Sequence, residues 1–565
     1  MKILSIAAFF LASLALAAYP HLQQWFLTGD PAWIADYDEL GLYLPIAAKA
    51  FWSQQWVMAD PLFESFHPIK YPWIQFIPFT WLVKQGFSDP AYVSVLWRLF
   101  AGLSLAFSYL LLTRKLMSSL MAALLASALL VFDVGLLEGK LVLKNYVIFF
   151  DLLTGSTALL GGPPRIHSAW RIISPGLSLA GLLLFYWSIF KYRDKNSNYS
   201  FVIPSLFFAG LFYTYFYHWT AAGLGLLVAM VFDGKYRAFY FKVGCIGTLL
   251  GAYEIFKSYQ IKASTSPDWL MRSDKFLPIP NFSELIIPKI ALLTLAICAY
   301  YSWTHRKDLK FLVAQSSAGL FLLNHQIVTG LQIENFHWLY PSGPTLSVLL
   351  IIVLADGLRT ISERHTFKHF KLMITLMLAV HFAVAFYLRH IEVTRSKDSL
   401  YMNAIYKGLR TESIAQVRSL MPAGSLIAGD ELVTETLAVH LGLRTFSGYL
   451  AILSPSLTDN EWNERLVLND LLLGFARPQF EAHQRAKLKD HHWGQNARTP
   501  GGREKRLEER LAVYDRIAEN PTLYIEKYGI QYIVRTPLAD STSTELRVPL
   551  GERIYNDKNL QIFQL

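Results

Sequence analysis

The sequence predicts a polytopic α-helical membrane protein with about 11 transmembrane helices, interfacial helices in the first outer loop and a C-terminal exoplasmic α/β domain. Three observations support this prediction. The 565 residues are 53% hydrophobic and only 17% charged, whereas a soluble domain usually carries about a quarter charged residues. Apolar runs of near-membrane length recur along the chain, separated by alternating basic and less basic segments. After Leu388 the composition becomes rich in charge and turn residues.

The formal charge and the cysteines narrow the class further. A net charge of +10 is typical of a membrane protein with basic cytoplasmic loops beside anionic lipid. We therefore expect the lipid bilayer as a partner and do not expect nucleic acid. Cys245 and Cys298 both lie inside apolar runs. A disulfide framework and a cysteine zinc site are therefore not expected.

The first apolar run admits two interpretations. The stretch MKILSIAAFFLASLALAAYP has the single lysine, apolar centre and small-residue end of a cleavable signal peptide, and it is also a slightly short membrane span. We favour a retained span, and cleavage of residues 1–18 stays open; both interpretations place residue 20 onward outside. A span needs about 20 mostly apolar residues. Candidate spans lie at 3–19, 92–112, 117–133, 174–190, 200–216, 218–232, 239–256, 286–303, 309–324, 342–358 and 371–388.

The basic loops predict the orientation. Short segments rich in Lys and Arg, at 113–115, 191–195, 233–237, 304–310 and 359–371, belong in the cytoplasm. The N-terminus is then cytoplasmic in the plasma (inner) membrane. The loops 20–91, 134–173, 257–285 and 325–341, with everything after 390, lie outside. A further span at 145–160 would invert every later loop, so we interpret that run as a re-entrant or interfacial helix.

The chain divides into a transmembrane domain at 1–390 and a soluble exoplasmic domain at 391–565. In the second domain SLIAGDELVTETLAVHLGLRTFSG predicts strand, helix and strand, and PTLYIEKYGIQYIVRTP predicts a helix followed by a strand. Short strands are expected again in ERIYNDKNLQIFQL, and a mobile loop leading into a helix is expected at 484–510. No glycine-rich nucleotide fingerprint occurs in this domain.

The first outer loop begins with an unusual density of acids. Asp36, Asp38 and Glu39 fall within four positions. The following YLPIAAKAFWSQQWV predicts an amphipathic helix lying at the membrane interface. The acids therefore precede an interfacial helix, whose N-terminus stabilises anions. His67 and Lys70 come later in the same loop.

Other ionisable residues are predicted at the same height on the outer side of the membrane. Ionisable groups at membrane depth are functional candidates by default, so their gathering indicates a polar cavity that opens outward. The second outer loop contributes Asp133, Glu138, Lys140, Lys144 and Arg171; span ends and turns contribute Arg98 and His218; the fourth outer segment contributes His325, Glu334, Asn335 and His337.

This arrangement resembles the GT-C superfamily of integral-membrane glycosyltransferases, among them protein O-mannosyltransferases, the aminoarabinose transferase of lipid A and oligosaccharyltransferases. Those enzymes have an acid, often Asp-Glu, in the first outer loop with a tyrosine a few residues on, as Asp38, Glu39 and Tyr43 have here. The resemblance concerns the architecture of about 390 residues, and the motif itself is short. It implies a sugar donor linked to a polyprenyl phosphate or diphosphate, and a glycan, lipid or protein as acceptor.

The resemblance implies roles for these residues. Asp38 is the first choice for the base that takes the acceptor proton or for a ligand of a divalent metal ion, and Asp36 and Glu39 are the competing choices. Cations should flank the donor phosphate. The candidates for that role are Lys140, Lys144, Arg171, Arg98, His67 and Lys70; further cavity candidates are Asp133, Glu138, His218 and His337, of which His337 is also a possible metal ligand.

Simpler interpretations stand beside these roles. The acids of the first loop can cap a helix, lysines can reach toward headgroups, and histidines beside aromatics can anchor the interface. A membrane transporter or flippase of lipid-linked saccharide is the main alternative function, although the chain has no convincing internal repeat. A non-catalytic assembly partner with the same fold is the third.

Overall fold

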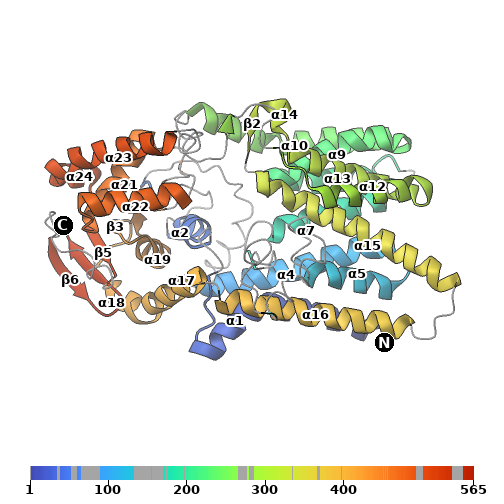
Figure 1. The fold of residues 1–565 in the computed structure, drawn as a ribbon, viewed down its shortest axis with the longest axis horizontal. Helices are drawn as coiled ribbons and strands as arrows, with labels where there is room; N and C mark the ends of the chain where they lie inside the picture. The colour runs from blue at the N-terminus through green and yellow to red at the C-terminus, as the bar shows by residue number, and fades with distance from the viewer. Residues whose placement is uncertain are drawn as a thin grey trace. The chain divides into compact units, whose positions relative to one another are not determined.

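The structure is a computed structural model (Figure 1). It describes residues 2–34, 39–52, 60, 62–64, 90–132, 154, 170–171, 176–195, 197–264, 277–278, 285–333, 335–364, 370–395, 397–448, 451, 454, 456–490, 501–536 and 551–565. The chain forms two compact units. The first unit comprises Met1–Leu27, Ser94–Phe256 and Ile279–Ser396, and the second unit comprises Thr28–Val93, Lys257–Pro278 and Lys397–Leu565.

A helix lies at each of the predicted apolar runs. Helix α1 and helix α10 extend beyond the predicted runs, because polar residues continue the helix past the apolar stretch. The long helices are α1 (Lys2–Thr28), α4 (Pro90–Leu116), α5 (Leu120–Phe132), α7 (Gly176–Tyr192), α8 (Val202–Phe212), α9 (Phe216–Phe232), α10 (Arg237–Ser264), α12 (Lys289–Thr304), α13 (Lys310–Leu322), α15 (Leu339–Arg364) and α16 (Phe370–Arg395). Shorter elements are η3 (Gly234–Tyr236), η4 (Lys307–Leu309), α14 (Gln326–Thr329), η5 (Asn335–Trp338), β1 (Leu277–Pro278) and β2 (Leu331–Gln332).

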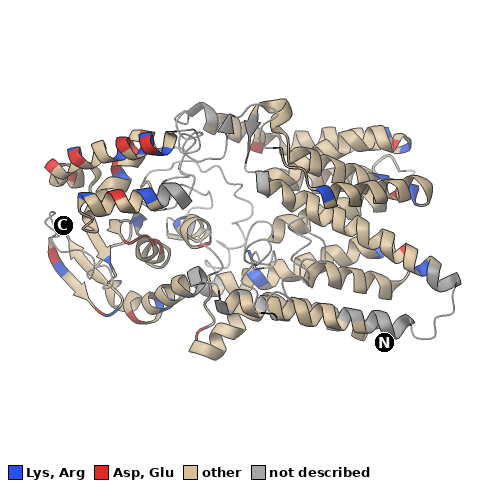
Figure 2. Cartoon of the chain, viewed as in Figure 1, with Lys and Arg blue, Asp and Glu red and all other residues tan. Residues whose placement is uncertain are grey.

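The helices of the first unit have the surface of an integral membrane protein. In the described part of the chain, four stretches are long and apolar enough to cross a bilayer: Ile3–Thr28, Ser94–Leu116, Gly234–Ile261 and Leu339–Thr360. Large apolar side chains such as Leu249 and Val231 face outward, and charges lie mainly toward helix ends (Figure 2). The number of spans, predicted as about 11, stays a prediction.

Close helix packing in the first unit depends on small residues. A Cβ atom on Gly251 of α10 would lie 2.5 Å from the ring of Phe212 on α8, and one on Gly247 would lie 2.5 Å from the ring of Phe208. These two glycines are one helical turn apart. Phe208 and Phe212, on consecutive turns of α8, fill the space that the two missing side chains leave. Small residues allow such approach in membranes, where packing rather than water drives helix association.

The second unit contains a mixed sheet between two layers of helices. Its strands are β3 (Leu426–Gly429), β4 (Arg444–Thr445), β5 (Tyr532–Arg535), β6 (Glu552–Asn556) and β7 (Gln561–Gln564), in the order β4-β3-β5-β7-β6. Strand β3 is parallel to β4 and β5, whereas β7 is antiparallel to β5 and β6. The strand and helix pattern predicted for this region is therefore confirmed. The helices are η1 (Glu39–Tyr43), α2 (Leu44–Trp52), α17 (Lys397–Gly408), η6 (Leu409–Ser413), α18 (Ile414–Val417), α19 (Glu431–Leu441), α21 (Asp459–Leu472), α22 (Arg477–Asp490), α23 (Gly502–Glu519) and α24 (Pro521–Tyr528).

Alternation along the central strands creates a core on each face of the sheet. Leu426 and Ala428 of β3 pack into a cluster with residues of α21, α22, α23 and α24. Ile427 between them points to the opposite face and joins a cluster with residues of α18 and α19. Successive side chains of a strand point to opposite faces, so a parallel strand covered on both sides needs apolar residues throughout.

Helix α22 corrects part of the sequence prediction for this unit. It continues to Asp490, so the beginning of the loop predicted at 484–510 is helical. Helix α23 is the helix into which this loop is predicted to lead. The buried Gln484 explains the extension, because its side chain donates to Asp470 and accepts from Arg510. The remainder of that predicted loop, 491–500, lies outside the described residues.

Segments of the first outer loop pack against the C-terminal part of the second unit. Asn403 of α17 accepts from the backbone N–H of Ile34 at 2.7 Å and donates to its carbonyl at 2.9 Å. The indole Nε1 of Trp52 donates to the carbonyl of Val439 at 3.2 Å. Thr28–Val93 belongs to the second unit by its contacts, and the division into a transmembrane domain at 1–390 and an exoplasmic domain at 391–565 stays a prediction.

Candidate functional site

Arg98 is a fully buried cation in the first unit. It lies on α4, and its side chain has 0% exposure. Its Nε donates to the backbone carbonyl of Trp170 at 2.6 Å, and its Nη1 lies 3.2 Å from Nε2 of His21 on α1. The Trp170 indole donates in turn to the carbonyl of Leu16 at 2.7 Å. Arg98 therefore joins α1, α4 and the described end of the second outer loop.

Arg171 directly follows Trp170 and makes the next contact. Its Nη1 donates to the hydroxyl of Tyr340, near the start of α15, at 3.3 Å. The ring of Tyr340 lies 5.4 Å from that of His337 in an edge contact. Arg171 is only partly buried, so it combines a fixed aromatic neighbour with access to solvent or ligand.

His337 links these residues to the turn between α8 and α9. Its Nδ1 is hydrogen-bonded to the hydroxyl of Tyr215, and its ring stacks on Tyr217 at 4.9 Å. Tyr215 also contacts His218, whose ring lies 5.0 Å away and is fully buried. Residues 213–219 therefore contribute specific contacts to a polar cluster.

We call this set the arginine–aromatic cluster. It connects Arg98, Arg171, His337 and His218, four residues that the sequence predicts as separate candidates. The connecting residues were not selected as site residues: His21, Trp170, Tyr215 and Tyr340. Their signal in the sequence is weak because Trp and Tyr are common at membrane interfaces whatever the function. The full cluster is His21, Arg98, Trp170, Arg171, Tyr215, His218, His337 and Tyr340.

Glu39 is the one acid of the first-loop triplet among the described residues. It opens the π-helix η1 in the second unit and is 2% exposed. Helix α2 follows at once, so an acid does begin the helix predicted for this segment. Helix α19 packs against both η1 and α2. A buried carboxylate at a helix N-terminus is stabilised as an anion by the helix dipole.

His325, which is 5% exposed, and Asn335, which begins η5, are also described. The other selected residues lie outside the described residues. They are Asp36, Asp38, His67, Lys70, Asp133, Glu138, Lys140 and Lys144, together with Trp56, Glu334 and all of the 145–160 run except Thr154. The roles suggested for these residues stay predictions.

A metal site finds no support in the described part of the chain. No group of three or more His, Cys, Asp or Glu side chains there is arranged to hold an ion. His337 is engaged by Tyr215 through Nδ1. A hydrogen bond at Nδ1 is compatible with coordination through the other ring nitrogen, so the metal-ligand role suggested for His337 stays a prediction.

Comparison with solved structures finds likenesses, whereas comparison with sequences finds none. No model of a known protein family matches the chain, and no curated protein sequence matches it. It resembles the crystal structure of ArnT from Cupriavidus metallidurans bound to undecaprenyl phosphate, with 11% sequence identity and a TM-score of 0.45. The likeness covers 99% of this chain and 97% of that one. A likeness of this size does not assign a function to the chain.

Proposed function

We propose that the chain is a membrane glycosyltransferase, which moves a sugar from a polyprenyl-phosphate or polyprenyl-diphosphate donor to an acceptor on the exoplasmic side. The observation that carries the proposal is the connection of Arg98 to Arg171 through consecutive residues of one loop. Two guanidinium groups are thereby held beside one aromatic cluster. Such an arrangement suits a phosphate, which accepts charge-assisted hydrogen bonds from planar arginine forks.

The two arginines have different roles in this proposal. Arg98 is buried and bonded to the Trp170 carbonyl, so it positions the loop and adds positive potential. Arg171 is partly exposed and is the group that contacts the donor phosphate. As the bond between the anomeric carbon and the phosphate oxygen breaks, the electron pair stays on that oxygen. A preorganised cation stabilises the developing charge.

The acceptor must lose a proton as its oxygen bonds to the anomeric carbon. Transfer with inversion places this task on a carboxylate within hydrogen-bond reach of the acceptor hydroxyl. Asp38 is our first choice, and Asp36 or Glu39 is the alternative. The remaining cations of the outer loops, Lys140, Lys144, His67 and Lys70, would extend the donor site, and Asp133, Glu138 and His218 would line the cavity. Support for this part is the resemblance of the Asp38, Glu39 and Tyr43 pattern.

The test is a transfer assay on the full chain reconstituted in liposomes, with radiolabelled polyprenyl-phosphate sugar as donor and an extract of envelope lipids and glycans as acceptor. We expect label to leave the polyprenyl carrier and appear on an acceptor. Asp38→Asn should lower the rate at least about a hundredfold, which is the usual contribution of general base catalysis. Asp36→Asn and Glu39→Gln are the matched variants that identify which acid acts.

Two outcomes overturn the proposal. Movement of intact labelled lipid between leaflets without bond cleavage would identify a flippase. Donor binding without turnover, unchanged by all three acid variants, would identify a non-catalytic assembly partner. Lys115→Gln, at an exposed position in the last turn of α4, is the control that should retain full activity.

A further inference from the structure

The second unit contains a pocket that the proposed donor site does not use. Its volume is about 390 Å³, which is sufficient for one or two sugar rings. The walls combine the first outer loop with the base of the C-terminal sheet. The lining residues are Leu62, Phe63, Glu64, Leu426, Arg444, Arg465 and Tyr528.

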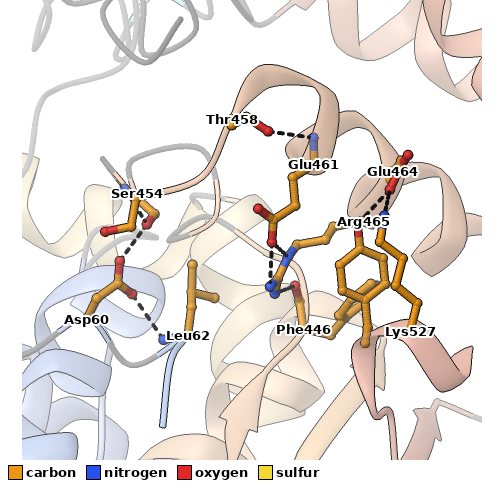
Figure 3. A network of polar contacts seen from close by, with 11 residues as sticks. Asp60, Leu62, Phe446, Ser454, Thr458, Glu461, Glu464, Arg465 and Lys527 are labelled. Carbon is orange, nitrogen blue, oxygen red and sulfur yellow. Dashed lines mark hydrogen bonds and ion pairs between the residues drawn. The ribbon is translucent and has the colours of Figure 1, made fainter. Parts of the chain in front are cut away.

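One wall of the pocket is a rigid stack of aromatic rings on a guanidinium group. The Arg465 guanidinium carbon lies 5.2 Å from the ring centres of both Phe446 and Tyr528, and 6.0 Å from that of Phe63. Its donors are engaged by Glu461 at 3.0 and 3.2 Å and by the Phe446 carbonyl at 3.1 Å (Figure 3). Arg465 therefore supports the rings and has its charge largely compensated.

The position of Tyr528 is fixed from behind. Its hydroxyl donates to Glu464 at 2.7 Å, and Lys527 contacts the same carboxylate at 2.6 Å. Burial favours a raised pKa for Glu464, but hydrogen bonds from Lys527 and Tyr528 outweigh it and hold the pKa below the usual value. Glu464 is therefore an anion that holds the Tyr528 ring at the pocket wall.

Arg444 supplies a cation whose charge is only loosely compensated. Its Nε donates to the Gly424 carbonyl at 2.7 Å, which fixes the guanidinium plane. Its Nη2 lies 3.8 Å from the carboxylate of Glu64, beyond hydrogen-bond distance, and the Glu64 side chain is 86% exposed. In the described part of the chain, the Gly424 carbonyl is the only hydrogen-bond acceptor of Arg444. An anionic ligand can therefore replace Glu64 at little cost.

The backbone beside the pocket is held by a second cation. Lys49 of α2 donates to the carbonyl oxygens of Phe63 and Glu64. Burial and the neighbouring charge of Arg444 lower the pKa of Lys49. Lys49 and Arg444 therefore lie close enough for their charges to interact, and the two cations favour an anion at this wall against the nearby Asp60 and Glu64.

We propose that this pocket binds an anionic sugar, with its carboxylate or phosphate on Arg444 and its ring against Phe63 and Tyr528. Sugar rings present C–H faces that pack on aromatic rings, and arginine binds both kinds of anion bidentately. The assignment of this sugar as the acceptor rests on the proposed function. The binding itself does not depend on that function.

The test measures binding to the full chain in nanodiscs by isothermal titration calorimetry. The probes are glucuronate, glucose 6-phosphate, neutral glucose and inorganic phosphate. We expect glucuronate and glucose 6-phosphate to bind at least about tenfold more tightly than either glucose or phosphate, because only they offer both a ring and an anion. Comparison of the first two separates a carboxylate site from a phosphate site.

We expect two variants at the pocket to change the affinity for anionic sugars differently. Arg444→Gln should weaken binding of the anionic sugars about tenfold or more and leave glucose unchanged. Glu64→Gln removes the competing carboxylate from an exposed position, so it should bind them as tightly or more tightly. Arg477→Gln disrupts an exposed ion pair with Asp515 elsewhere in this unit and should have no effect.

Several results would overturn the pocket assignment: equal affinity for glucose and glucuronate, weaker binding by Glu64→Gln, or no change in Arg444→Gln. The outcomes also separate this inference from the proposed function. Anionic-sugar binding without any sugar transfer leaves the pocket standing and removes its role as an acceptor site. If Arg444→Gln still transfers sugar and still binds the anionic sugars with unchanged affinity, the pocket assignment is refuted and the proposed transferase function is not.

Discussion

The Nε of Arg98 donates to the backbone carbonyl of Trp170 at 2.6 Å, inside the first unit and away from solvent. A buried guanidinium is costly unless it is hydrogen-bonded. This one orients the residue that precedes Arg171. The contact therefore links a helix that the sequence predicts well to a loop whose conformation it does not predict.

Replacing Arg98 tests this link. Arg98→Met should lower thermal stability in detergent, because the Trp170 carbonyl and the His21 ring each lose a buried donor, at about 1–3 kcal/mol per group. Arg98→Lys keeps the charge but loses the planar guanidinium group. Its melting temperature should lie between those of Arg98→Met and the wild type. Lys115→Met, at an exposed position of the same helix, is the control. Equal melting temperatures for Arg98→Met and Lys115→Met would refute a structural role.

Arg171 should act on donor affinity. Arg171→Gln removes one charge-assisted contact worth about 1.5–3 kcal/mol, so the donor KM should rise about tenfold to a hundredfold. Tyr340→Phe removes only the neutral partner at 3.3 Å and should have a much smaller effect. Steady-state kinetics with varied donor measure both. An unchanged KM in Arg171→Gln would place the donor phosphate elsewhere.

The packing of α8 on α10 predicts a difference between two glycines. Gly251→Ala should lower the melting temperature, because its Cβ would lie 2.5 Å from the Phe212 ring and overpacking costs about 1–3 kcal/mol. Gly210→Ala on α8 meets nothing within 4 Å and should be neutral or stabilising by helix propensity. Combining Gly251→Ala with Phe212→Leu should recover part of the loss. The same melting temperature for both glycine variants would contradict this packing.

Asp557, in the turn between β6 and β7, predicts a pH dependence of stability. Burial favours a raised pKa, but hydrogen bonds from Ser413 and Tyr555 and from the backbone N–H groups of Asn559 and Leu560 outweigh it, so the pKa lies below its usual value. A depressed carboxylate pKa stabilises the fold above the unfolded pKa of about 3.9, and this stability is lost as the pH falls through the folded pKa.

Asp557→Asn should therefore destabilise the protein at pH 7 by about 1–3 kcal/mol. The difference from the wild type should shrink as the pH falls below about 4. Urea unfolding of both proteins at pH 7 and at a pH below about 4 measures this difference in the free energy of unfolding. A difference that is independent of pH would show that the carboxylate charge contributes nothing.

The candidate site was predicted in part. Arg98, Arg171, His218 and His337 were selected because ionisable groups near membrane depth are rarely accidental, and the structure connects all four. His21 and Trp170 were missed because a histidine and a tryptophan near a span end are expected for membrane anchoring alone. The anionic-sugar pocket was also missed, since Phe63, Arg444 and Tyr528 are far apart in sequence and carry no common motif.

The sequence by itself determined the membrane class, the positions of the long helices and the strand and helix pattern of the C-terminal sheet. Those properties depend on local hydrophobicity and on the periods of helix and strand, which neighbouring residues carry. Only the tertiary structure decided that the described residues of Thr28–Val93 belong to the same unit as the sheet, that Arg98 contacts Trp170 and that Arg444 faces Glu64. Such contacts join chain segments that are tens to hundreds of residues apart. Local sequence patterns do not predict which distant segments come together.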